Sequence, residues 1–471
     1  MGHSSLIKNT ALLFINKVSL VLSSFILLPV FTANFGAAEY GLATLIAGYV
    51  SLLAPLLTLR MDIGIFKHIV EARDDHNRIK VIVSSFALIM LPILLGFLCV
   101  SISAGILFNI PYYPLIVGNI LIAILFSLIS QFSRGIGRTS AFVSVSLLVT
   151  VISFVISLLG ITMLELGIEI IFISAIISQL LGIVALAINT SMLQFLSAKH
   201  IDKTTQKQLL KYSLPLVPDS ASYWVMNISD RTVLSVFLGI SSAGIYTVAN
   251  KFSSIVDQAI GVFFQAWTES ATEYAKKENR DRLYSDVFSV YMRVFVSISL
   301  VITSLIPFIF PILVKGDEFQ SANLYVPILM YAMIAHAAEA FISSIYLANN
   351  LTKQIAKTTL FGAVINIIIN IMLVMCVGIW AAAISTLISY LITAIYRYYN
   401  VRKYGIILQV APGLMCTILV AIAINASLFY WNNTTGDVLS LLFTGIVVVF
   451  LSYRIVIAGW PNIKSKIIGH S

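Results

Sequence analysis

The sequence predicts an all-α integral membrane protein with about fourteen transmembrane helices, and three observations support this prediction. First, 59% of the residues are hydrophobic and only 10% are charged, which excludes a protein that has water as its main solvent. Second, apolar runs of about twenty residues, long enough to cross the hydrocarbon core as a helix, recur from end to end. Third, Lys and Arg fall almost entirely on alternate connections between these runs.

The apolar runs set the bounds of the predicted helices. The first six cover residues 9–33, 40–59, 81–108, 113–133, 139–162 and 167–193. The next six cover 213–239, 244–267, 287–313, 323–348, 358–377 and 379–398, and two more cover 408–431 and 438–458. The longest connection has only about twenty residues, which leaves no room for a folded domain outside the membrane. The function must therefore reside among the helices.

The distribution of Lys and Arg predicts how the helices are oriented, because loops rich in these residues stay in the cytoplasm. One set of alternate connections contains only Lys315. The other set contains Arg60, Lys67, Arg73, Arg78, Lys80, Arg134, Arg138, Lys199, Lys203, Lys207, Lys211, Lys276, Lys277, Arg280, Arg282, Lys353, Lys357, Arg397, Arg402, Lys403, Lys464 and Lys466. Both termini are therefore predicted to be cytoplasmic. The same asymmetry accounts for the net charge of +9, so no nucleic-acid partner is expected.

An internal repeat divides the predicted helices into two parallel halves. A shift of 203 residues places FGAAEYGLAT over LGISSAGIYT, so that Gly41 meets Gly244, and it places Lys8 over Lys211. Parallel repeats are common in transporters that work by alternating access. The predicted division is a six-helix lobe in residues 1–197, a second in 198–404, and two added helices with a tail in 405–471. A substrate is expected to bind in a central cavity between the lobes.

Ionisable side chains inside a membrane helix are costly, so they mark sites that have a partner or a function. Lys17 lies about two turns into the first helix, and a lysine that snorkels to the headgroups is the alternative interpretation. The helix predicted at 213–239 carries a polar stripe at spacings i, i+4, i+8 and i+11: Asp219, Tyr223, Asn227 and Asp230. Such a stripe indicates either a cavity lining or hydrogen bonding between helices.

Arg231 and Lys251 are further cations inside predicted helices of the second half. If they converge with Lys17, they form a cationic substrate-binding site in the cavity. A guanidinium binds phosphate oxygens in a bidentate manner, so such a site suits an anionic head group such as a pyrophosphate.

Three further ionisable residues are candidates for coupling transport to an ion gradient. His336 and Glu339 lie at i and i+3 in the helix predicted at 323–348, and Asp257 lies in the one at 244–267. A histidine beside a carboxylate in a membrane is a candidate site for H⁺ or Na⁺, although buried structural pairing is equally compatible with the pattern. The other histidines and the three cysteines are too scattered to form a metal site, so no metal or other cofactor is expected.

Four stretches of the sequence resemble the polysaccharide biosynthesis family, which includes the Wzx-type O-antigen flippases. These stretches are FGAAEYGLATLIAGY, RMDIGIFKHI, LLKYSLPLVPD and SDRTVLSVFLGISSAGIYTVANKF. The family belongs to a superfamily of multidrug, oligosaccharidyl-lipid and polysaccharide exporters that also contains the lipid II flippase. The resemblance implies two six-helix lobes around a cationic cavity.

The resemblance also implies a function. The expected substrate is an undecaprenyl-pyrophosphate-linked oligosaccharide, such as an O-antigen unit of lipopolysaccharide, moved from the cytoplasmic to the periplasmic leaflet of a bacterial inner membrane. Ion-coupled antiport is expected, and the partners would be membrane lipids, a polysaccharide polymerase and assembly proteins.

Two alternatives remain open. A multidrug extruder would share the fold, but its cationic substrates favour acidic cavities, whereas Lys17, Arg231 and Lys251 are cations. A membrane-embedded polysaccharide polymerase would need a long catalytic loop, which the short connections do not provide. A transporter without enzymatic activity is therefore the expectation.

Overall fold

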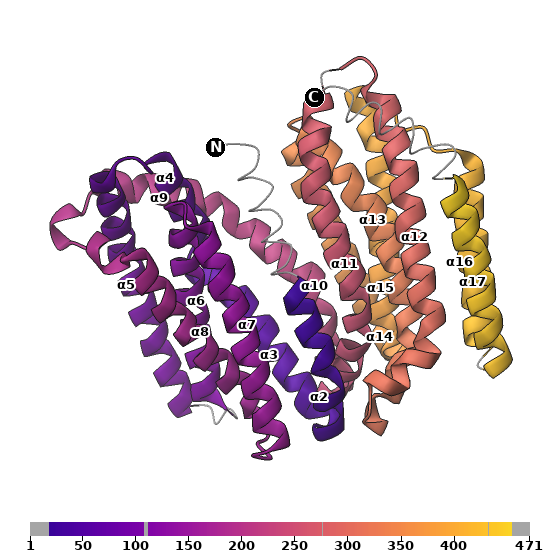
Figure 1. Ribbon diagram of the computed structural model, residues 1–471, viewed down its shortest axis with the longest axis horizontal. Coiled ribbons are helices and arrows are strands. Elements are labelled where there is room, and N and C mark those ends of the chain that lie inside the picture. Colours follow the sequence, from indigo (N-terminus) through magenta and orange to yellow (C-terminus); the bar gives the residue numbers. More distant parts are fainter. Residues whose placement is uncertain (1–17, 108–111, 276, 432, 455–471) are drawn as a thin grey trace. The chain divides into compact units, whose positions relative to one another are not determined.

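The computed structural model describes residues 18–107, 112–275, 277–431 and 433–454, and these residues form helices with short connections and no strand (Figure 1). Within the described residues, eleven helices are long and apolar enough to cross a membrane. The predicted all-α membrane fold is therefore confirmed.

The first six predicted helices are found in order. Residues 18–26 are helical and lead into α2 (Leu28–Asn34). The long helices that follow are α3 (Ala37–Leu57), α5 (His76–Leu107), α6 (Tyr113–Gly135), α7 (Thr139–Thr162) and α8 (Glu169–Thr190). The connections contain short helices, which are α4 (Met61–Glu71), η1 (Met192–Phe195), η2 (Ala198–His200) and α9 (Lys203–Ser213).

The remaining eight predicted helices also appear. They are α10 (Val217–Leu238), α11 (Ile240–Tyr274), α12 (Arg280–Leu313), α13 (Val326–Ala348), α14 (Thr352–Val377), α15 (Trp380–Asn400), α16 (Pro412–Tyr430) and α17 (Thr434–Arg454). Short 3-10 helices join some of them, namely η3 (Leu214–Leu216), η4 (Asp317–Tyr325) and η5 (Val401–Tyr404).

The helices α10 and α11 differ from the others in composition. With 22 and 35 residues they are long enough to cross a membrane, yet they are not among the eleven apolar spans of the described residues. They are also the helices for which the sequence predicts the polar stripe and the cations Arg231 and Lys251. Since a lipid-facing helix is predominantly apolar, these two helices are the expected place for a functional site.

The contacts between helices divide the chain into two compact units. Unit 1 comprises the described residues up to Phe35 together with Leu42–Ile228, and unit 2 comprises Gly36–Gly41 together with the described residues from Ser229 onward. These limits differ from the lobe boundaries at 197 and 404, which were drawn from the sequence repeat. The repeat boundaries stay a prediction about the parts that move in transport.

The core of unit 1 packs along most of the length of α6. A cluster of buried apolar side chains joins α4, α5, α6 and α9 and includes Met61, Ile65, Phe86, Ile124, Phe132 and Leu209. At the start of α9, the Asp202 carboxylate accepts hydrogen bonds from the backbone of Thr204 and Thr205. The hydroxyl of Thr205 also donates to this carboxylate, and these bonds hold the pKa of Asp202 below its usual value.

Unit 2 is built around α13, because 78% of its most apolar stretch is buried. The helix packs against α11, α12 and α15. Aromatic rings fill the space beside it: Phe341 of α13 lies 5.5 Å from the Trp267 ring and 5.3 Å from the Tyr291 ring, centroid to centroid. These ring contacts pack α13 against α11 and α12.

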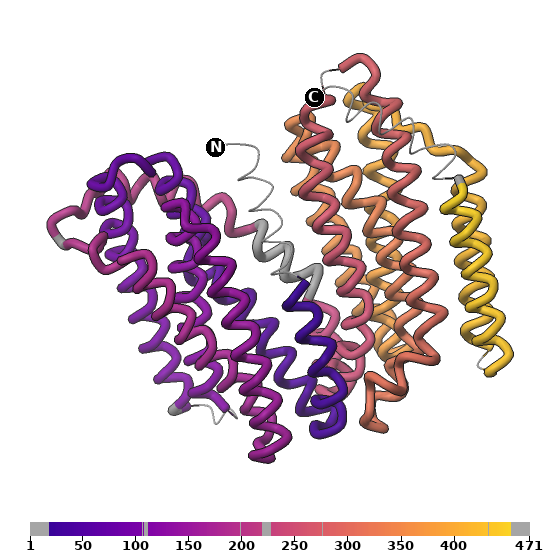
Figure 2. The backbone as a smooth tube through the Cα atoms, viewed as in Figure 1, coloured from indigo at the N-terminus to yellow at the C-terminus, as the bar shows by residue number. Residues whose placement is uncertain are grey.

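The last two helices form a hairpin that packs on α12, shown in yellow in Figure 2. The amide of Asn425 in α16 donates to Ser304 of α12 at 2.8 Å and to Thr444 of α17 at 3.1 Å. Its carbonyl oxygen accepts from the Tyr331 hydroxyl of α13 at 2.8 Å. Because polar groups in a bilayer need partners, this one amide fastens the added pair of helices to unit 2.

Candidate functional site

Four of the predicted site residues have side chains outside the part of the chain that the structure describes. Lys17 lies outside the described residues. Asp219, Tyr223 and Asn227 fall within α10, but their side chains also lie outside the described part. Their roles stay predictions.

Asp230 of α10 is the centre of a buried hydrogen-bond network within unit 2. Its side chain, in a residue only 5% exposed, accepts hydrogen bonds from Tyr246 of α11 at 2.9 Å, Asn370 of α14 at 2.9 Å and Thr386 of α15 at 2.7 Å. Four helices therefore meet at one carboxylate. Of the two interpretations of the polar stripe, the contacts of Asp230 correspond to hydrogen bonding between helices.

Arg231, the next residue, is placed differently. Its Nε atom is buried and has no hydrogen-bond partner in the described part of the chain. Lys251 of α11 lies within electrostatic range of Arg231, and Arg231 in turn interacts with Tyr246, Tyr40 and Asp230. Among the described residues no carboxylate lies within 4.0 Å of either cation.

Two of the three predicted cations, Arg231 and Lys251, thus interact electrostatically within unit 2. A buried guanidinium nitrogen without an acceptor leaves a hydrogen bond unmade, which is costly in a low-dielectric setting. An anion with several oxygens would supply that acceptor and also balance the charge of Lys251.

A second polar group in unit 2 contains all three candidates for ion coupling. His336 Nδ1 lies 3.0 Å from Glu339 Oε2, as their spacing on one helix predicts. His336 Nε2 lies 3.2 Å from Asp257 Oδ1, so α11 and α13 are joined through the imidazole. The ring of Tyr390 in α15 packs on the imidazole at 4.5 Å between centroids.

Arg397 of α15 completes this group, although the sequence placed it among the basic residues of a cytoplasmic connection. It is fully buried and forms an ion pair with Glu339. Its Nε donates to Thr358 at 2.8 Å, and its Nη2 donates to Thr359 at 3.0 Å. A signal was present in the sequence: Ser385, Ser389, Thr393 and Arg397 recur every four residues and form one polar helix face.

The exposure of this group rises from one end to the other. The exposed fractions of the side chains are 0% for Arg397, 11% for Glu339, 19% for His336 and 40% for Asp257. Arg397 neutralises Glu339, so the proton on His336 decides whether the remaining His336–Asp257 pair is neutral or carries one negative charge. Asp257 is therefore the most exposed charged member of the group.

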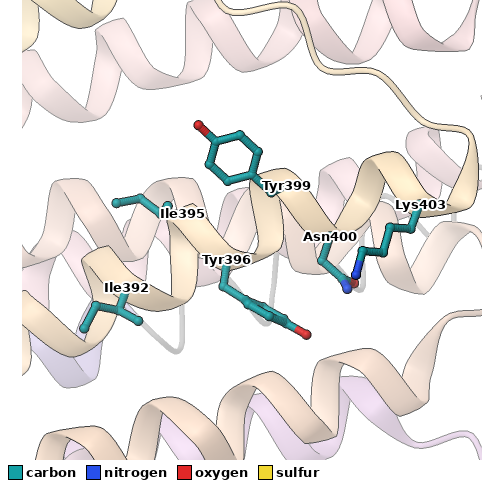
Figure 3. A pocket seen from close by; sticks show the side chains of 6 residues that line it. All are labelled: Ile392, Ile395, Tyr396, Tyr399, Asn400 and Lys403. Carbon is teal, nitrogen blue, oxygen red and sulfur yellow. The ribbon is translucent and has the colours of Figure 1, made fainter.

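A pocket of about 380 Å³ lies on α15 and η5. Figure 3 shows its side chains, with Lys403 extending toward Asn400. Tyr396 and Tyr399 are 46% and 61% exposed, and tyrosines with a lysine are typical of the boundary between membrane and water. None of the residues that line this pocket belongs to the groups around Arg231 and His336.

Comparison with solved structures identifies the fold. Lipid II flippase MurJ in an inward closed conformation superimposes with a TM-score of 0.70 at 15% identity, over 96% of this chain and 100% of that one. A multidrug resistance MATE family transporter of the MOP superfamily, in an inward-facing conformation, gives a TM-score of 0.68 at 13% identity. That match covers 83% of this chain and 98% of the transporter. At these identities the likeness shows the fold alone.

Comparison of sequences identifies the family. A protein named "Probable low-salt glycan biosynthesis flippase Agl15", from Haloferax volcanii, is 25% identical over 259 residues, which are 52% of this chain. The match spans about half of that relative, 53% of its length. The model of the family described as "Polysaccharide biosynthesis protein" matches residues 6–268, which is more than half of the 471 residues. The chain therefore belongs to the polysaccharide biosynthesis protein family.

Proposed function

We propose that this protein is a flippase that moves an undecaprenyl-pyrophosphate-linked oligosaccharide, an O-antigen unit or a similar one, from the cytoplasmic to the periplasmic leaflet of a bacterial inner membrane. The observation that carries the proposal is the buried, unpaired Nε of Arg231 beside Lys251. A pyrophosphate would supply the acceptor oxygen that Arg231 Nε lacks, and its negative charge would favour binding near both cations. The similarity to a protein named as a glycan biosynthesis flippase supports the same substrate class.

The proposed mechanism is alternating access coupled to an ion gradient. Arg231, Lys251 and Lys17 bind the pyrophosphate, while the polyprenyl tail stays in the lipid. Asp257, His336 and Glu339 bind H⁺ or Na⁺, because a change of charge in this group alters its cost in the membrane and so biases one conformation over another. A polysaccharide polymerase and assembly proteins would act on the delivered glycan, and both termini would lie in the cytoplasm.

The test uses cells that depend on this chain for surface polysaccharide. Lys17, Arg231 and Lys251 are each replaced by Gln, and Lys207→Gln, an exposed change on α9, is the matched control. We expect at least a severalfold loss of surface glycan for the three site variants at unchanged protein level, with normal display for the control. Normal display in all three site variants would overturn the cationic site.

A multidrug extruder of the same fold is the second candidate function, since a MATE transporter superimposes on this chain. Extrusion of organic cations favours free carboxylates, but the buried carboxylate of Asp230 already accepts hydrogen bonds from three side chains at 2.7 to 2.9 Å. The resistance of cells to ethidium, measured with and without expression of the chain, distinguishes the two hypotheses. We expect no change in resistance when the chain is expressed.

A further inference from the structure

A pocket of about 370 Å³ lies within unit 1 between α6 and α7, with Leu20 on its rim. This volume falls within the range of small-molecule sites. Arg134 lies in its wall together with the hydroxyls of Ser127, Ser130 and Thr150. None of the lining residues is acidic. The pocket thus combines one cation with several hydroxyl groups and has no carboxylate to neutralise the cation.

Arg134 is held in position by its surroundings. Its guanidinium carbon lies 5.0 Å from the centroid of the Phe66 ring and 5.5 Å from that of Phe142. One Nη atom donates to Gln131 Oε1 at 3.1 Å. The other guanidinium donors have no acceptor among the described residues, and the same residues offer no ion pair to Arg134. Several N–H groups are therefore available to a ligand.

The backbone carbonyls at the C-terminal end of α6 accept their side-chain hydrogen bonds from another arginine, not from Arg134. The backbone carbonyls of Arg134 and Gly135 accept hydrogen bonds from Arg73, at 3.4 and 3.0 Å. The C-terminal carbonyls of a helix otherwise attract cationic side chains. Because Arg73 satisfies them, the side chain of Arg134 is left for the pocket.

Ser130 supplies an independent sign of a ligand. The residue is only 6% exposed, and its hydroxyl has no hydrogen-bond partner in the described part of the chain. Other buried helical hydroxyls of unit 1, such as those of Thr150 and Thr190, donate to the carbonyl four residues earlier. Ser130 and Arg134 lie at i and i+4, so the unpaired hydroxyl and the guanidinium are on one face of α6.

We propose that this pocket binds the phosphate group of a lipid. A guanidinium takes two phosphate oxygens at once, and the Ser130 hydroxyl donates to a third. Arg134 lies at the end of α6 that leads to a predicted cytoplasmic connection, which is the level of lipid headgroups. The ligand is then either the lipid pyrophosphate that enters from the cytoplasmic leaflet, in which case the inference rests on the proposed function, or a bilayer phospholipid.

The test measures binding to the full chain, purified in a lipid-free, uncharged detergent. The probes are farnesyl pyrophosphate, dioleoyl phosphatidylglycerol and inorganic pyrophosphate. The variants are Arg134→Gln, Arg134→Lys and Ser130→Ala, with Arg138→Gln as the matched control. Arg138 is exposed, lies outside the pocket lining and follows Arg134 by four residues. Size-exclusion profiles check that each variant is folded.

We expect Arg134→Gln to weaken binding of a phosphate-bearing lipid at least tenfold, because charge-assisted hydrogen bonds are lost. We expect Arg134→Lys to lose less affinity than Arg134→Gln, and Ser130→Ala to lose about threefold in affinity. The control Arg138→Gln should bind with wild-type affinity. A preference for farnesyl pyrophosphate identifies the transported lipid as the ligand, and a preference for phosphatidylglycerol identifies a bilayer lipid. If Arg134→Gln does not fold, the result for Ser130→Ala decides.

Two results would overturn the inference. One is wild-type affinity for all three probes in both Arg134→Gln and Ser130→Ala, and the other is an equal loss in Arg138→Gln. The proposed function is judged separately by the glycan display of Arg231→Gln. If Arg231→Gln abolishes display while Arg134→Gln binds normally, the pocket is rejected and the flippase proposal stands. If Arg134→Gln loses binding and Arg231→Gln displays glycan normally, the pocket stands and the cationic site of the flippase proposal is rejected.

Discussion

Gly41 of α3 lies directly against Gly244 of α11, and the two glycines occupy equivalent positions in the two halves of the sequence repeat. A Cβ atom on Gly41 would lie 2.9 Å from the Gly244 nitrogen, and one on Gly244 would lie 3.1 Å from the Gly41 nitrogen. A Cβ at Gly244 would also overlap the Ala37 carbonyl. The two backbones therefore cross so closely that only glycine fits, as in other tightly packed membrane helices.

Larger residues at this crossing should destabilise the fold. We expect Gly41→Val and Gly244→Val each to lower the free energy of unfolding by about 2 kcal/mol or more, because the added atoms meet backbone that cannot rotate away. Thermal unfolding in detergent measures the effect. Gly96→Ala in α5 is the control, since a Cβ there would have no neighbour within 4 Å. Equal melting temperatures for the valine variants and the control would contradict the prediction.

The ion pair of Arg397 and Glu339 should show strong coupling. Arg397→Met leaves the Glu339 charge buried without its partner, at a cost of about 3 to 5 kcal/mol. The double variant Arg397→Met with Glu339→Met removes both charges and should lose less than Arg397→Met alone. A double-mutant cycle of unfolding free energies measures the difference. Additive losses would show that the two side chains act independently.

Asp257 should affect the use of an ion gradient more than stability, because it is the exposed end of the group with His336 and Glu339. We expect Asp257→Asn to unfold near the wild-type temperature and to reduce at least severalfold the stimulation of glycan-lipid transport by a Na⁺ or pH gradient in vesicles. Glu269→Gln, an exposed change on the same helix, is the control. Full stimulation in Asp257→Asn would remove this residue from the coupling site.

Asn425 should hold α16 and α17 on unit 2. Its replacement by Ala removes hydrogen bonds to Ser304, Tyr331 and Thr444 and leaves the buried Tyr331 hydroxyl without its acceptor. We expect a loss of about 1 to 2 kcal/mol and faster proteolysis of the link between α15 and α16. Ser427→Ala is the control, because that hydroxyl bonds only within its own helix. Unchanged proteolysis would show that apolar packing alone fixes the hairpin.

The helices could be predicted from the sequence because the signal is local. A run such as 139–162 is mostly apolar and contains no charged residue, and the observed α7 has the same bounds. The predicted helices were too short at α11 and α12. The observed α11 continues to Tyr274 and the observed α12 begins at Arg280, because charged residues extend both helices beyond their apolar runs. The predicted spans stopped where the apolar runs stop, whereas the helical hydrogen bonds continue into the polar segments.

The candidate site could be predicted only where the partners are close in sequence. The contact between His336 and Glu339 follows from their spacing on one helix. Arg397 was assigned to a connection because a charged residue near the end of an apolar run resembles a loop residue, and its ion pair spans 58 positions. Adjacent residues on a helix point about 100° apart, so Asp230 and Arg231 are not expected to pair, but which groups surround Arg231 Nε depends on the packing of distant helices.

The sequence by itself determined the membrane fold, the order and approximate length of the helices, and the residue types with which a pyrophosphate or an ion could interact. Only the tertiary structure decided that Asp230 is used within a network of four helices, that Asp257 joins His336, and that Arg397 neutralises Glu339. The physical reason is that burial of an apolar run depends on its own composition, whereas the pairing of a polar side chain depends on which distant helices pack around it.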